Sequence, residues 1–269
     1  MSYRLGLIGA GNMAEAIVQG ALRSGLLPVD ISAADPSAER RDLFRDQFAV
    51  TVSPDNRFVA DRSDVLILAV KPQCVDAVLA DLRPHLRPDH LLVSIAAGVP
   101  LHKIGDSILI SPGPRLIRAM PNTPLLVGHG LVALCGGPTA TDADLELVHD
   151  LFAAGATVIE LPEEKFDAVT AVSGSGPAYF FFFVEALTAA GIEVGLSPEE
   201  AALLAATTFI GAAQLLAAER LDPAELRRRV TSPGGTTAAA LDSFTKNNYA
   251  GIVAQAVQAA ADRSRDLGQ

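Results

Sequence analysis

The sequence predicts an α/β protein in two parts, a mostly parallel sheet covered by helices and then an all-helical region. Up to about residue 160, short apolar runs alternate with helical patterns, which is the order of elements in a parallel sheet. From about residue 163 no strand pattern remains. The chain has 269 residues and is 49% hydrophobic, enough for one large domain or two ordinary ones. We place the domains at residues 1–161 and 162–269.

The strands of the first part are short apolar runs bounded by turn residues. Pro72 ends one of them, and Pro36 with Ser37 opens a helix. The predicted strands cover residues 4–10, 30–35, 64–72, 91–98, 115–122, 130–137 and 157–161. The predicted helices cover residues 12–25, 36–48, 73–86 and 142–156.

The second part is a series of helices with recognisable starts and breaks. Ser197, Pro198 and Glu200 stand at the N-cap, N1 and N3 positions of one helix. Asp222 caps a short helix, and the stretch from Gly174 to Pro177 breaks or starts a longer one. The predicted helices cover residues 167–195, 197–219, 222–230, 237–248 and 249–267.

Several of these helices are apolar nearly all round. The segment AALLAATTFIGAAQLLAA, residues 201–218, has only threonine and glutamine as polar side chains. Such a helix needs burial on every side, and a helical domain of about 105 residues does not easily surround several of them. A second copy of the chain does, so we predict a homodimer through the C-terminal helices. The alternative is a monomer whose helices pack on the first domain.

The bulk composition excludes several classes of protein. A net charge of −10 argues against nucleic-acid binding by general electrostatics. Two cysteines cannot form a disulfide framework and suggest a reducing compartment, and the five histidines show no metal-ligand spacing. We see no signal peptide and no apolar run of the roughly 20 residues that a membrane span needs. We therefore expect a cytoplasmic, soluble protein without a metal.

The first predicted strand-to-helix turn carries the glycine fingerprint of a dinucleotide site. Residues 9–14 are GAGNMA, the G-x-G-x-x-A form. Gly9 allows the tight turn, Gly11 lets the backbone approach a pyrophosphate, and Ala14 keeps the helix close to the sheet. The helix N-terminus adds free N–H groups and a positive dipole end. The first part is therefore predicted to be a Rossmann-type dinucleotide-binding domain; a glycine turn without a ligand is the alternative.

The residue that ends the second strand bears on the choice of cofactor. Asp35 in this place usually holds the ribose 2′-hydroxyl and favours NAD. Ser37, Arg40 and Arg41 follow within two helical turns and are able to receive a 2′-phosphate. The sequence leaves NADH and NADPH open.

Other strand ends are expected to line the same crevice, outside the carboxyl ends of the strands. They are Ala69–Pro72, Ser94–Gly98 and Met120–Pro124. Small residues there let a nicotinamide lie against the backbone, and Asn122 is placed to bind its carboxamide. Lys71 is either a cofactor contact or a solvated surface lysine.

No catalytic nucleophile is visible in the sequence. VSGSGP is not a nucleophile elbow, because positions 173 and 177 would have to be glycine and are serine and proline. With a nicotinamide bound, the protein has to hold an electrophile against the ring and assist proton movement.

Over essentially its whole length the chain resembles pyrroline-5-carboxylate reductases. The resemblance rests on GLIGAGNMAEAI, DVLILAVKP, SIAAGV, MPNTP, DAVTAVSGSGPAYFFFF and, most specifically, TSPGGTTAAAL. It implies an oxidoreductase that reduces the cyclic imine 1-pyrroline-5-carboxylate to L-proline, the last step of proline biosynthesis, with NADPH or NADH. It also implies an all-α C-terminal dimerisation domain, an active site at the dimer interface, and dimers that often assemble into decamers.

The resemblance, together with the strand-end argument, assigns the candidate site residues. Asp35 stands where the family often has a small polar residue, which puts the usual preference for NADPH in doubt, and Asn56 lies in a loop after a short third strand. The predicted cofactor residues are Ile8, Gly9, Ala10, Gly11, Asn12, Met13, Asp35, Asn56, Ala69, Val70, Lys71, Pro72, Ala96, Ala97 and Asn122. The predicted substrate residues are Glu163, Ser232, Gly234, Gly235, Thr236 and Thr237, with Glu164 as the alternative to Glu163.

These residue types suit a substrate with a carboxylate and a C=N bond. Backbone N–H groups around Gly234 and Gly235, next to a helix N-terminus, form an anion site. Thr237 is the predicted catalytic residue: its hydroxyl is too weak an acid to protonate the imine, but it can hydrogen-bond and orient the nitrogen. The competing interpretations are another imine or β-hydroxyacid-type reductase of the same plan, and a dinucleotide-binding regulator without catalysis.

Overall fold

The chain forms two compact units. A computed structural model describes residues 3–108 and 110–268. The first unit comprises residues 1–175 and 259–269, and the second comprises residues 176–258. This division lies beyond the boundary expected between residues 161 and 162, and the last turns of the C-terminal helix group with the first unit.

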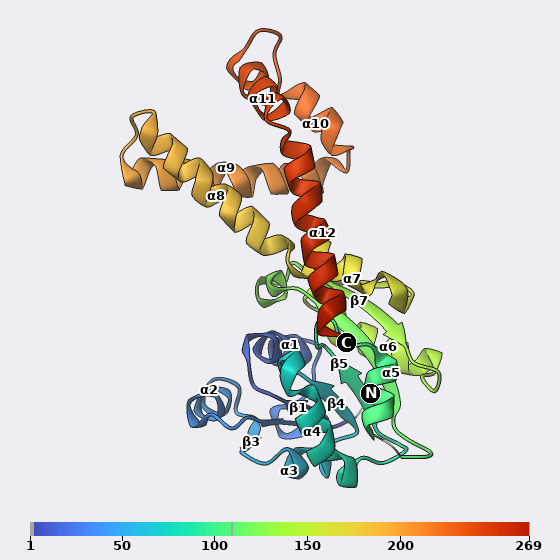
Figure 1. Cartoon of the computed structure of the whole chain (residues 1–269). Coiled ribbons are helices and arrows are strands. Elements are labelled where there is room, and N and C mark those ends of the chain that lie inside the picture. Colours follow the sequence, from blue (N-terminus) through green and yellow to red (C-terminus); the bar gives the residue numbers. More distant parts are fainter. Residues whose placement is uncertain (1–2, 109, 269) are drawn as a thin grey trace. The chain divides into compact units, whose positions relative to one another are not determined.

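Figure 1 shows the first unit as a sheet with helices around it. Among the described residues this sheet has eight strands in the order β3-β2-β1-β4-β5-β6-β7-β8. All neighbouring strands are parallel except β6 and β7, so the predicted mostly parallel sheet is confirmed. The strands are β1 (Leu5–Ile8), β2 (Ile31–Ala34), β3 (Thr51–Ser53), β4 (Val65–Leu68), β5 (Leu91–Ser94), β6 (Arg115–Pro121), β7 (Gly130–Gly136) and β8 (Ala156–Glu160).

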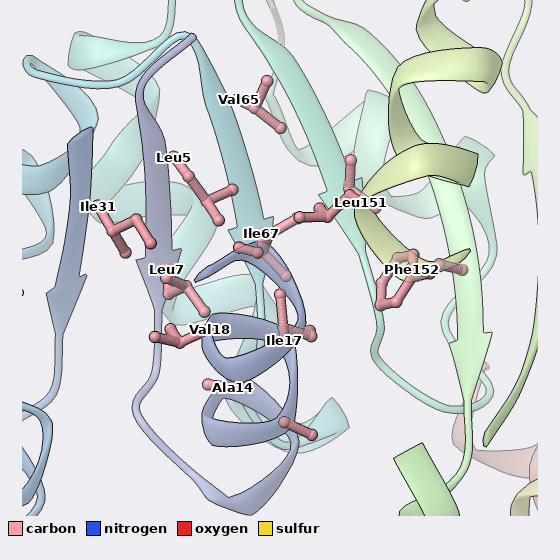
Figure 2. Close-up of a cluster of buried hydrophobic side chains, with 14 of the residues drawn as sticks. Leu5, Leu7, Ala14, Ile17, Val18, Ile31, Val65, Ile67, Leu151 and Phe152 are labelled. Atoms are coloured by element: carbon pink, nitrogen blue, oxygen red, sulfur yellow. The ribbon is translucent and has the colours of Figure 1, made fainter. Parts of the chain in front are cut away.

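Both faces of this sheet are buried. Successive side chains of a strand point to opposite faces, so one strand contributes buried residues to the clusters on both sides. On β1, Leu5 and Leu7 belong to one hydrophobic cluster and Ile8 to a second one. Figure 2 shows Leu5 and Leu7 gathered with Ile17 and Val18 of the first helix. Since helices cover both faces, the ends of the strands are where the centre of the sheet can meet a ligand.

The helices of the first unit follow the predicted alternation, with two additions. The short helices at residues 56–60 and 101–108 were not expected, so Asn56 begins a helix rather than lying in a loop. Ser37 accepts a hydrogen bond from the Arg40 N–H and caps its helix, as its position predicts. The helices are α1 (Asn12–Arg23), α2 (Ala38–Phe48), α3 (Asn56–Ala60), α4 (Val75–Leu82), α5 (Leu101–Ile108), α6 (Asp142–Ala153) and α7 (Phe166–Val169). Single turns are η1 (Pro28–Asp30), η2 (Pro72–Cys74), η3 (Arg83–His85), η4 (Thr123–Val127), η5 (Glu163–Lys165) and the π-helical η6 (Thr170–Gly174).

The second unit contains only helices among its described residues. The break predicted from Gly174 to Pro177 is present, since the π turn ends at Gly174 and the next helix starts at Gly176. The capping box of Ser197 and Glu200 is also present. The helices are α8 (Gly176–Glu193), α9 (Pro198–Glu219), α10 (Pro223–Arg229) and α11 (Thr236–Lys246), and α12 (Tyr249–Leu267) crosses into the first unit.

The long helices expose much apolar surface in the single chain. Phe181 and Phe182 of α8 are 66% and 69% exposed, and Leu203 of α9 is 69% exposed. By length and composition, the helical segments Glu163–Glu193 and Pro198–Glu219 are apolar enough to cross a membrane. The expectation that no segment reaches this length is therefore wrong, because it counted uninterrupted apolar runs and not whole helices.

Candidate functional site

The turn between β1 and α1 is shaped for close backbone approach. Gly9 has a φ of +99°, and a Cβ on it would lie 2.7 Å from the carbonyl oxygen of Ala69. Its N–H donates to Ala34 O at 2.8 Å. Among the described residues, a Cβ on Gly11 would meet no atom within 4 Å beyond its chain neighbours, and no side chain caps the start of α1. The turn therefore leaves an open space in front of a helix N-terminus, which suits an anionic group.

The sheet brings the ends of three predicted strands to this turn. The Ala69 N–H donates to Ile8 O at 2.8 Å, and the Ile95 N–H donates to Leu68 O at 3.2 Å. The predicted stretch Ala69–Pro72 and the pair Ala96 and Ala97 therefore continue from neighbouring strands, β4 and β5. This is the edge at which a doubly wound sheet binds its ligand.

Asp35 is held against the glycine turn. Its carboxylate oxygens accept from the N–H groups of Ala10 and Ser37, both at 2.8 Å. Arg41 donates to the carbonyl oxygen of Asp35 at 2.7 Å, and Arg40 donates to the carbonyl oxygen of Ala10. The sequence left Asp35 and the two arginines as competing determinants of cofactor choice. All three are bonded to the loop after β1 or the loop after β2.

Two predicted asparagines are in different surroundings. Asn56 donates to a carboxylate oxygen of Asp81 at 3.3 Å, at the start of α3. Asn122 uses both ends of its amide: Nδ2 donates to the Ser173 hydroxyl at 3.2 Å, and Oδ1 accepts from the Leu131 N–H at 2.9 Å. Asn122 therefore joins the end of β6 to β7 and to the π-helical turn.

The second glycine-rich turn lies in the second unit, before α11. Gly234 has a φ of +71°, and the Gly235 N–H donates to Ser232 O at 3.0 Å. Among the described residues no side chain caps α11, and no hydrogen bond occupies the hydroxyls of Ser232, Thr236 or Thr237. The Thr231 hydroxyl, by contrast, donates to Arg227 O at 2.6 Å. The turn brings together all the predicted substrate residues except Glu163, which belongs to the first unit.

Glu163 contacts a residue that the sequence reasoning missed. Its Oε1 accepts from Arg118 Nη1 at 3.0 Å and from the Leu101 N–H at 2.7 Å. Arg118 lies in β6 and only 6% of its side chain is exposed. The signal that would have found it is a charge inside the apolar strand RLIRAMPN.

Burial, aided by the charge of Glu163, raises the pKa of the Cys135 thiol to about 12, so this cysteine is unreactive.

Glu163 and Arg118 also face a cavity of about 890 Å³ in the first unit. Its wall carries both signs of charge, since Lys103 and Arg265 stand with Asp106 and Glu164. Among the described residues no group of His, Cys, Asp or Glu could hold a metal ion.

Two family models match the chain. The model for pyrroline-5-carboxylate reductase dimerisation matches residues 163–267. The model for NADP oxidoreductase, coenzyme F420-dependent, matches residues 4–98, which include the glycine fingerprint.

Whole-chain comparisons give the same result. The pyrroline-5-carboxylate reductase of Pseudomonas aeruginosa is 44% identical over 99% of this chain and 97% of its own, and that of Arabidopsis thaliana is 41% identical over 100% and 96%. The crystal structure of the Plasmodium falciparum pyrroline carboxylate reductase with NADP bound is similar at a TM-score of 0.89, with 30% identity over 100% and 99% of the two chains. The Coxiella burnetii pyrroline-5-carboxylate reductase has a TM-score of 0.90 and 34% identity, over 100% of both chains.

The two glycines of the first turn should respond differently to alanine. Gly9→Ala should lower the free energy of unfolding by about 1–3 kcal/mol, because the methyl group meets Ala69 O in a left-handed backbone. Gly11→Ala should cost less, about 0.5–1 kcal/mol, because only a helix cap is weakened. Both should weaken NADPH binding, measured by fluorescence titration beside urea unfolding. Equal losses of stability would contradict this interpretation of the turn.

Proposed function

The chain belongs to the pyrroline-5-carboxylate reductase family and reduces 1-pyrroline-5-carboxylate to L-proline with NADPH, and we propose that its two glycine-rich turns hold the two reactants. The turn from Gly9 to Met13 holds the cofactor, and the turn from Ser232 to Thr237 holds the imine. The main support for the first assignment is the backbone of Gly9, which is left-handed. In this conformation the main chain of Gly9 lies close to Ala69, and the space in front of Gly11 is open.

The residues around the first turn fit a dinucleotide. The uncapped N-terminus of α1 offers N–H groups to the pyrophosphate. Val70, Lys71 and Pro72 after β4, with Ala96 and Ala97 after β5, line the nicotinamide side. The remaining proposed cofactor contacts are Ile8, Ala10, Asn12, Asn56, Ala69 and Asn122.

The adenosine end contains opposing groups. The Asp35 carboxylate repels a 2′-phosphate, whereas Arg41 and Ser37 attract one. Both Asp35 oxygens already accept a backbone N–H, which spreads the negative charge over the loop. We propose that Arg41 takes the 2′-phosphate while Asp35 holds the loop.

The second turn binds the substrate through its carboxylate and its ring nitrogen. Among the described residues no side chain caps the N-terminus of α11, so the N–H groups of its first turn are available to a carboxylate. The hydroxyl of Thr237 hydrogen-bonds the ring nitrogen and orients it, and the proton on nitrogen comes from water or a relay. Bound NADPH supplies the hydride that reduces the C=N bond at C5. Thr237 contributes by holding the protonated nitrogen, since the positive iminium is the better hydride acceptor.

The exposed apolar helices support an association between copies of the chain. The matched dimerisation region includes α8 and α9. A groove of about 560 Å³ in the second unit is lined by Phe182, Phe183, Leu187, Tyr249 and Ile252. Isolated helices of this kind would expose a large apolar patch to water. We propose a soluble, cytoplasmic homodimer through the C-terminal helices, able to assemble further into a decamer.

A steady-state assay with NADPH and NADH side by side tests the function. Turnover of 1-pyrroline-5-carboxylate is expected with both, with the lower KM for NADPH if Arg41 binds the 2′-phosphate. Arg41→Ala should then raise the KM for NADPH and leave the KM for NADH nearly unchanged. A preference for NADH in the wild type would mean that Asp35 binds the ribose hydroxyls, and cofactor binding without turnover would contradict the enzymatic assignment.

Thr237→Ala should lower kcat/KM for the imine by roughly 10- to 1,000-fold, the range for one oriented donor. Thr237→Ser should recover much of the loss. The matched control is Thr231→Ala, because the Thr231 hydroxyl is already bonded to Arg227 O. Unchanged kinetics in a folded Thr237→Ala protein would remove Thr237 from the mechanism.

Light scattering at low micromolar concentration should give at least twice the 28.0 kDa mass of one chain. Phe181→Glu should shift the protein toward the monomer, because it places a charge on the exposed face of α8. Val29→Glu, at an apolar residue of the first unit that is 77% exposed, is the control and should not shift it. A clean 28.0 kDa species in the wild type, or its partition into lipid vesicles in place of dimers, would contradict the proposal.

A further inference from the structure

The two oxygens of the Glu163 carboxylate are in different situations. Oε1 accepts from the Leu101 N–H at 2.7 Å and from Arg118 Nη1 at 3.0 Å. Oε2 accepts no hydrogen bond from the residues that the structure describes. The side chain is 32% exposed and faces the cavity of about 890 Å³. The protein therefore holds one oxygen of this acid and leaves the other as an acceptor for a ligand.

Arg118 is fixed on both sides by the sheet. It lies in β6, opposite Ser94 of β5 and Cys135 of β7. Only 6% of its side chain is exposed, and its guanidinium lies 4.8 Å from the centroid of the buried Phe166 ring. A buried arginine needs a charged partner, and Glu163 supplies it.

The same guanidinium contacts the segment after β8 at two points. Glu163 is the first residue of η5, and Phe166 is the first residue of α7. A planar guanidinium can stack on the ring and donate to the carboxylate at once, which an ammonium group does less well. With the Leu101 N–H as its only donor, the carboxylate would keep more rotational freedom. Arg118 therefore restricts the direction in which Oε2 points.

We propose that Arg118 is a positioning residue for the substrate, which holds Oε1 of Glu163 so that Oε2 is presented to the positively charged ring nitrogen of the protonated imine and of proline. This inference rests on the proposed function and on the substrate role predicted for Glu163. The nitrogen of proline carries two N–H groups, so it has a donor for this acid besides the one for Thr237. Such a charge-assisted hydrogen bond is stronger than a neutral one, and small displacements of a positioning group have large kinetic effects.

The experiment compares Arg118→Met with Arg115→Met. Arg115 begins the same strand, and its Nη1 pairs with the buried Asp144 at 2.8 Å, so its loss breaks a similar ion pair away from Glu163. Arg118→Met should raise the KM for the imine, and the Kd for L-proline measured by calorimetry without cofactor, about 10-fold, the effect of misplacing a hydrogen bond to a charged group. The Kd for NADPH should stay within about twofold, because its site shares no contact with Arg118. Arg115→Met should lower the urea midpoint and leave all three constants near their wild-type values.

A ligand without the ring nitrogen separates positioning from a general loss of structure. Cyclopentanecarboxylate has the ring size and the carboxylate of proline but no nitrogen. Its Ki against the imine should be the same in Arg118→Met as in the wild type, whereas the Ki for L-proline should rise about 10-fold. Arg118→Lys keeps a charge beside Glu163 and should lose affinity for L-proline by a smaller factor. In a Glu163→Gln protein, adding Arg118→Met should change the Kd for L-proline little, because the acid that Arg118 orients is already gone.

The outcomes separate this inference from the function on which it rests. A wild-type chain that neither reduces the imine nor binds L-proline overturns the proposed function and the inference together. Normal wild-type kinetics with an unchanged Kd for L-proline in Arg118→Met overturns the inference alone. An equal loss of affinity for L-proline and cyclopentanecarboxylate means a structural role only and also overturns it. If Arg118→Met does not fold, Arg118→Lys provides the same comparison of the two ligands.

Discussion

Burial of both faces of the parallel sheet is the constraint on which the first unit depends. The strands β1, β2, β4 and β5 are buried along their whole length and are mostly apolar, so their side chains pack inside the protein and do not face a ligand. Groups that can contact a ligand are therefore confined to the strand ends, where backbone atoms and small residues are accessible. This explains why the turn at Gly9 and the pair Ala96 and Ala97 have almost no functional side chains.

Charged residues near this edge mainly organise backbone. Asp35 joins two loops through the N–H groups of Ala10 and Ser37, and Glu163 joins η5 to the start of α5. A carboxylate is suited to this task because it accepts several N–H groups at once, and such charge-assisted bonds are stronger than neutral ones. These two backbone segments are thus each fixed by an acid that accepts hydrogen bonds from their N–H groups.

The alternation of strands and helices, the capping box at Ser197 and the break before Gly176 were predictable, because each follows from local rules of periodicity and capping. The pairing of Arg118 with Glu163 was not, since it joins residues far apart in sequence and depends on the order of β5 and β6. Helix α3 was missed because it has only five residues, and α5 was missed because Gly105 interrupts its helical pattern. The two uses of the Asn122 amide also depend on contacts that only the folded sheet provides.

The second unit differs from the first in leaving much of its apolar surface exposed in the single chain. Its helices have no sheet to pack against, and the short polar face of α9 leaves residues such as Leu203 and Ile210 exposed in one chain. Burying apolar surface stabilises a protein by roughly 25 cal/mol per Å². A second copy of the chain would therefore add most stability by covering these exposed apolar side chains. In the proposed homodimer, folding of this unit and association are linked, and its stability depends on protein concentration. The proposed substrate turn, Ser232–Thr237, lies in this unit, so in the proposed homodimer association would stabilise the element on which the turn is built.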